Sequence, residues 1–184
     1  MKVVTQSEFT ELERNPEFSW YYRDASPEQP WIFDASDQYI SFNFEKNSPR
    51  RKDDLDTLCE DFQGLFAGFT TAYLHISEPE LFIPSGLSLV HAIRRAYGES
   101  RTVEEAPSHI FTGDEADLLW GFYFLMVQMS WSFHITFPQY PCAIGYSFPG
   151  EHYFISWKSS ELYQRAKELL KDFHPEFQHE EKKS

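Results

Sequence analysis

One stretch of the chain alternates strictly between hydrophobic and polar residues. The hydrophobic positions are Met129, Trp131, Phe133, Ile135 and Phe137, and the polar positions between them are Ser130, Ser132, His134 and Thr136. A period of two is typical of a β-strand. We therefore expect a strand over about 130–137 and two more over 142–148 and 152–157. Short links that contain proline and glycine separate these segments, so the three strands should form an antiparallel meander.

The N-terminal part predicts a short helix over 7–14 and a strand over 18–22. A second alternating run, 38–44, follows the apolar run 31–33 across a turn of Asp and Ser residues. Two such runs around a turn of this composition favour a β-hairpin.

Hydrophobic residues recur at three- and four-residue steps in four further segments, which predicts helices. The first begins near Asp53, and its stripe extends to Tyr73. Gly64 and Gly68 interrupt it, so either another element packs closely against the helix there or the helix ends near Gly68. The other helices are expected over 85–97, from Asp114 to Met129, and over 159–173. Tyr97 is assigned to the inner side of its helix, and residues 99–117 are expected to form a polar connection.

These elements predict an α+β fold. The antiparallel sheet combines an N-terminal hairpin with the C-terminal three-strand meander, and about four helices pack to one side. A chain of 184 residues suits one domain, assigned to 1–173. The tail, 174–184, follows His174-Pro175 and is expected to fray.

The net charge of the chain disfavours two classes of partner. The chain has 16 Lys and Arg against 29 Asp and Glu, a net charge of −13. This charge repels phosphate backbones and anionic lipids, so we expect neither nucleic acid nor a membrane as a partner. Residues 118–150 lack charged side chains, yet their period-two alternation argues against a membrane span. The N-terminus has no apolar signal segment and only Cys59 and Cys142 are present, which favours free thiols in the cytoplasm.

Candidate catalytic residues are few. None of the seven histidines has a second ligand at a zinc-binding spacing in a rigid segment, and no cofactor motif occurs, so no metal and no cofactor are expected. The best acid–base candidates are His134, Glu151 and His152 on the predicted meander, because a histidine beside a carboxylate can transfer protons near neutral pH. They would support the alternative function of a small-molecule-binding protein or a hydrolytic enzyme.

The acidic residues suggest a different role. A surplus of carboxylates lies between residues 99 and 117, and its members are Glu99, Glu104, Glu105, Asp114, Glu115 and Asp117. A second acidic group occupies the exposed side of the first long helix, at Asp53, Asp54, Asp56, Glu60 and Asp61. Such charge attracts basic proteins and accelerates their association.

In size, acidity and aromatic content the chain resembles bacterial immunity proteins, which neutralise toxins. The likeness is one of composition and size and has no residue correspondence. The expected function is therefore that of a non-catalytic module that binds a basic protein, with toxin neutralisation or another inhibitory role as one form. A third alternative is a subunit whose aromatic face packs on a second copy, as a homodimer.

Overall fold

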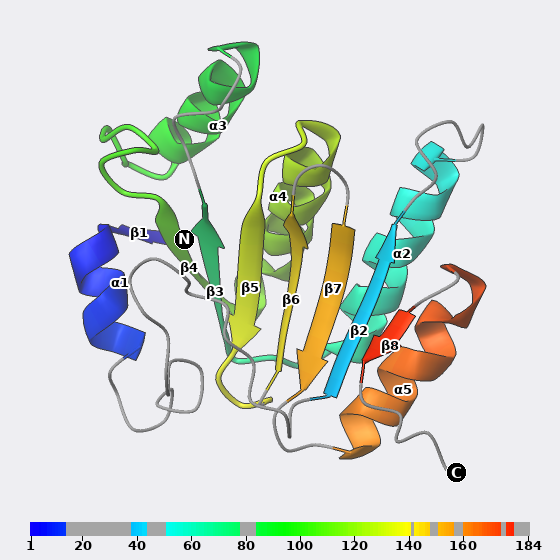
Figure 1. Ribbon diagram of the computed structural model, residues 1–184. Helices are drawn as coiled ribbons and strands as arrows, with labels where there is room; N and C mark the ends of the chain where they lie inside the picture. Colours follow the sequence, from blue (N-terminus) through cyan, green and yellow to red (C-terminus); the bar gives the residue numbers. More distant parts are fainter. Residues whose placement is uncertain are drawn as a thin grey trace, which may run out of the picture.

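An antiparallel sheet of eight strands forms the centre of the protein in the computed structural model (Figure 1). The structure describes residues 1–13, 38–43, 51–77, 84–140, 142–147, 151–156, 160–173 and 176–178. Within these residues the strands are β1 (Lys2–Val4), β2 (Gln38–Asn43), β3 (Thr71–Ile76), β4 (Ser108–Thr112), β5 (Phe133–Phe137), β6 (Cys142–Ser147), β7 (Glu151–Ser156) and β8 (Glu176–Gln178). Their order across the sheet is β1-β4-β3-β5-β6-β7-β2-β8.

Helices occupy both faces of this sheet. They are α1 (Gln6–Glu13), α2 (Arg51–Leu65), α3 (Pro84–Ala96), α4 (Ala116–Gln128) and α5 (Ser160–Leu170), with short 3₁₀ turns η2 (Gly113–Glu115) and η3 (Lys171–Phe173). α2 packs between α4 and α5, and these three helices cover one face. Phe9 of α1 packs against the opposite face. The predicted α+β architecture is confirmed, with α1 as the helix on the second side.

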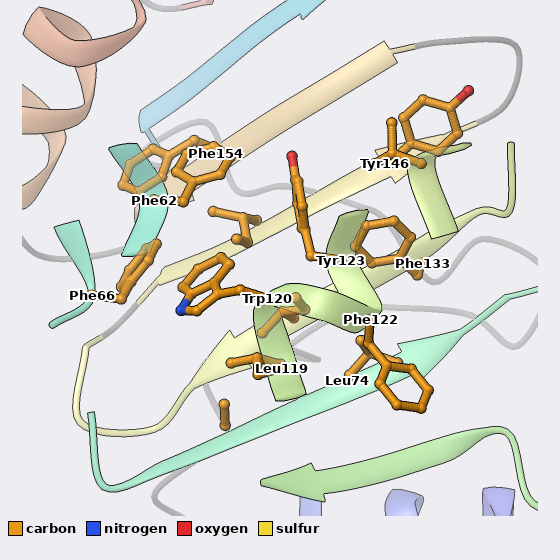
Figure 2. Packing of buried hydrophobic residues seen from close by; sticks show 14 of the residues in the cluster. Phe62, Phe66, Leu74, Leu119, Trp120, Phe122, Tyr123, Phe133, Tyr146 and Phe154 are labelled. Carbon is orange, nitrogen blue, oxygen red and sulfur yellow. The ribbon is translucent and has the colours of Figure 1, made fainter. Parts of the chain in front are cut away.

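The main core lies between the sheet and the three-helix layer. Many of its aromatic residues come from α2, α4 and the central strands, and Phe42 of β2 and Tyr163 of α5 also belong to it. Figure 2 shows Tyr123 in the middle of this cluster, with Phe62 and Phe154 on one side of it and Phe133 and Tyr146 on the other. Tyr123 lies 5.8 Å from Phe62 and 5.3 Å from Phe133 between ring centroids, and both ring pairs are nearly perpendicular. Edge-to-face contacts of this kind add to the stabilisation that burial provides.

The C-terminal meander forms as the alternation predicted. β5 pairs with β6, and β6 pairs with β7, both antiparallel. The uncharged stretch therefore contains a buried helix, α4, followed by strands. Within the described residues, no helix is long and apolar enough to cross a membrane.

The long helical stripe divides into a helix and a strand. α2 ends at Leu65, Gly68 adopts a left-handed conformation with φ of +80°, and β3 begins at Thr71. Of the two alternatives for Gly64 and Gly68, the end of the helix near Gly68 is the one observed. Phe69 and Tyr73 continued the helical spacing by coincidence, and the alternating burial of β3 is the stronger signal.

Besides β3, three short strands were not predicted. β1 and β4 pair at one end of the sheet, and β4 lies within the segment that was expected to be a connection. β8 lies in the expected tail and pairs with β2. The second arm of the predicted hairpin is β2, whose neighbours are β7 and β8. Its first arm, 31–33, and the strand expected at 18–22 lie outside the described residues.

α3 extends beyond the upper end of β3 and β4 in Figure 1. Val90 is fully buried, and Gly98, with φ of +82°, follows the helix as predicted. Tyr97 is 50% exposed, so its assignment to the inner side is wrong. The reason is that the helix ends at Ala96, and the turn that follows directs the side chain outward.

Candidate functional site

The two candidate histidines of the meander lie on opposite faces of the sheet. His134 of β5 is aligned with Gly145, and Gly145 with Tyr153. His152 is the residue next to Tyr153 along β7, so it points to the other face. The two imidazoles therefore do not form one site.

His152 is part of the core beneath the three-helix layer. It is 1% exposed and stacks on Phe42, with ring centroids 5.2 Å apart. Its Nδ1 lies 3.1 Å from the hydroxyl of Tyr123, in a buried hydrogen bond. Glu151 is the first residue of β7, and its side chain lies outside the part that the structure describes. These contacts place His152 within the packed core.

His134 belongs to a buried polar cluster that the sequence did not reveal. Its ring centroid lies 5.1 Å from that of His75 on β3, and His75 Nδ1 lies 2.7 Å from Ser108 Oγ on β4. These three residues are direct cross-strand neighbours. Phe9 covers the cluster from α1 and stacks on His75 at 5.1 Å. The missed signal was the alternating pattern of β3, which places Tyr73 and His75 on one face.

Burial determines the charge state of this cluster. Burial lowers the pKa of His75 to about 4 and holds the pKa of His134 well below its usual value, with the neighbouring His75 lowering it further. Both imidazoles are therefore neutral at pH 7. A hydroxyl beside a neutral histidine is the arrangement of a serine nucleophile and its base. Ser108, however, is fully buried, so the described geometry offers a substrate no route to its oxygen.

The acidic residues predicted to bind a partner do not form a single patch. Glu99, Glu104 and Glu105 precede β4, and Asp114, Glu115 and Asp117 follow it. A five-residue strand separates these two groups by about 15 Å. The six carboxylates therefore lie near opposite ends of β4.

Three of the six predicted carboxylates form hydrogen bonds within the protein. Glu99 accepts hydrogen bonds from Nε and Nη2 of Arg101 at 2.9 and 2.6 Å, and these bonds lower its pKa to about 2. Glu105 accepts the backbone N–H of Thr102 at 2.7 Å. In the same way, Glu115 accepts the backbone N–H of Thr112 at 3.0 Å.

Each of the two threonine–glutamate pairs has the spacing of a capping box, in which the glutamate stabilises the start of a turn. The remaining three predicted residues, Glu104, Asp114 and Asp117, are exposed.

The three-helix layer bears a larger acidic surface. Over 55–65 and in α4, α5 and η3 the described side chains include seven carboxylates and three cations. The carboxylates are Asp56, Glu60, Asp61, Asp117, Glu161, Glu168 and Asp172, and the cations are Arg165, Lys167 and Lys171. The side chains of Asp53 and Asp54 lie outside the described part. The second acidic group of the sequence thus continues from α2 onto α5.

A groove of about 330 Å³ lies between α2 and α5 within this acidic surface. Leu65, Leu169 and Gly64 contribute apolar surface, and Glu60, Asp61, Glu168 and Arg165 contribute the charges. The two helices lie side by side on the right of Figure 1. The groove therefore combines apolar surface with three carboxylates and one cation.

Two further findings concern metals and relatives. Among the described side chains, no group of three or more His, Cys, Asp or Glu residues is arranged to hold a metal ion. Comparison with protein-family models, curated proteins and solved structures finds no match to this chain.

Proposed function

We propose that this protein is a non-catalytic module that binds a basic protein partner, with neutralisation of a toxin or another inhibitory role as one form. The observation that carries the proposal is the acidic outer surface of α2, α4 and α5, which encloses a partly apolar groove. Protein interfaces combine apolar contact area with complementary charge, and this surface offers both.

The charge acts first on association. A net charge of −13 produces a negative potential around the whole molecule and attracts a basic protein before contact. Glu104, Asp114 and Asp117 are exposed and belong to neither capping box, and their charges contribute to this potential. Glu99, Glu105 and Glu115 have structural contacts, so their substitution would test stability as well as binding.

The first experiment is capture of partners from native lysate at low and high salt, with identification by mass spectrometry. The captured protein is then purified, and its association rate is measured by stopped flow. Reversal of charge at the three exposed carboxylates, Glu104→Lys, Asp114→Lys and Asp117→Lys together, should slow association about tenfold and flatten its dependence on salt.

The matched control neutralises the same positions, as Glu104→Gln, Asp114→Asn and Asp117→Asn, and should give an intermediate rate. An association rate that is unchanged in both variants contradicts the proposal. The mass of the free protein in solution, measured by light scattering, separates binding of a partner from assembly with a second copy.

A further inference from the structure

The groove between α2 and α5 has two kinds of surface. Leu65 is 3% exposed and Leu169 is partly buried, and both line it. Glu60 and Asp61 of α2 and Glu168 of α5 line the groove, and Glu168 already forms an ion pair with Lys171. This arrangement matches a long side chain with an aliphatic stem and a cationic end.

The electrostatics of Asp61 support the same ligand. Burial raises the pKa of its carboxyl group, and the negative charges of Glu60 and Asp172 raise it further. An unbound carboxylate in these surroundings is less stable than one in water. A cation placed beside it would relieve both the desolvation and the repulsion.

We propose that this groove receives a lysine or arginine side chain of the basic partner, with the aliphatic stem on Leu65 and Leu169 and the charged end beside Glu60 and Asp61. This inference rests on the proposed function and adds to it the position and chemistry of the anchor. The negative net charge of the protein itself disfavours a second copy as the occupant.

Gly64 allows the groove to be blocked without a change of charge. A Cβ at this position would meet no atom within 4 Å, so Gly64→Leu projects a side chain into open space beside the lining residues. Gly121 on α4 is also helical and exposed, a Cβ added there would meet no atom within 4 Å, and it does not line the groove. Gly121→Leu is therefore the matched control, and both substitutions favour the helix.

The probe is a blocked pentapeptide with two lysines and one leucine, and the same peptide with glutamates in place of the lysines serves as its control. Titration is followed by the amide chemical shifts of the ¹⁵N-labelled protein. We expect saturable shift changes at 60–65 and 165–169 with the lysine peptide alone. Gly64→Leu should abolish these changes, and Gly121→Leu should preserve them.

Substitutions of charged residues provide a second test, because two of them should change the affinity for the peptide in opposite directions. Asp61→Asn should weaken peptide binding by up to about fivefold, which corresponds to the loss of one ion pair at the protein surface. Arg165→Gln should strengthen binding, because it removes a positive charge from the groove. Glu161 is an exposed carboxylate of α5 outside the groove, and Arg95 is an exposed cation of α3. Glu161→Gln and Arg95→Gln are the respective controls and should change binding much less.

The outcomes separate this inference from the proposed function. If the lysine peptide binds with equal affinity to the wild type and to Gly64→Leu, the groove is not the anchor site, although the protein still binds basic ligands. If Glu161→Gln weakens binding as much as Asp61→Asn, overall charge explains the affinity and the inference is again wrong. If neither the lysine peptide nor a basic protein from lysate binds the wild type, the proposed function itself fails.

Discussion

Substitution of His109 by leucine should protect the protein from acid. His109 on β4 is fully buried, on the face of the sheet that the helix layer covers, with its ring centroid 5.2 Å from that of Phe122. Burial, with a smaller contribution from the positive charge of Arg94, lowers the pKa of His109 to about 3 from 6.5. The imidazole is therefore neutral in the folded protein over most of the acidic range.

The sign and size of the effect follow from proton linkage. The unfolded chain takes up a proton at His109 below about pH 6.5, whereas the folded protein does so only near pH 3. The contribution is complete above pH 6.5 and is lost as the pH falls toward 3. At pH 4.5 this loss amounts to about 3 kcal/mol of unfolding free energy. A domain is stable by only about 5–15 kcal/mol, so the effect is readily measurable.

The assay is unfolding by guanidinium chloride at pH 7 and pH 4.5, followed by tryptophan fluorescence. Leucine has a similar volume and cannot bind a proton, so the free energy of unfolding of His109→Leu relative to wild type should rise by about 3 kcal/mol between these pH values. Phe111→Leu on the same strand is the control. It should destabilise the protein by about 1–2 kcal/mol equally at both pH values. If His109→Leu shows the same constant offset at both pH values, burial does not lower the pKa of His109.

Two further predictions concern the sheet and the thiols. Gly145→Ala should lower the free energy of unfolding by about 2–3 kcal/mol, because the new Cβ would lie 2.2 Å from Oη of Tyr153. The control Gly121→Ala, whose Cβ would meet no atom within 4 Å, should raise this free energy slightly. Equal effects of the two substitutions in denaturant unfolding would contradict this prediction. Burial raises the pKa of Cys59 from 9.0 to about 12, with Asp56 adding to the shift, so at pH 8 iodoacetamide should alkylate it about 1000-fold more slowly than a cysteine of ordinary pKa, as measured by mass spectrometry. Urea should restore the normal rate, and rapid labelling of the folded protein would show that the thiol is not shielded.

The local periodicity of hydrophobic residues correctly predicted part of the secondary structure. The alternation around His134 predicted β5, and the nearly continuous apolar run before it was correctly predicted as the helix α4. Periodicity failed where a helical spacing continued by coincidence into β3. It also failed for β1, β4 and β8, since strands of three to five residues are too short to show a period.

The candidate sites depended on contacts between distant residues. The expectation that His134 lies on a polar strand face was compatible with its spacing, yet Phe9, from the opposite end of the chain, covers that face. The carboxylates of 99–117 looked equivalent along the chain. Arg101 pairs with one of them, and capping contacts engage two others, so these three differ from the remaining three in their contacts with described residues.

Charge, composition and most helices could be derived from the order of the residues, because they depend on each residue and on neighbours within a turn or two. The faces on which the histidines lie, the contacts that distinguish the carboxylates and the groove between α2 and α5 could be found only in the folded chain. Each of these features joins segments that are far apart in sequence, such as α2 and α5. Their proximity results from burying one face of the sheet beneath three helices, which no local pattern encodes.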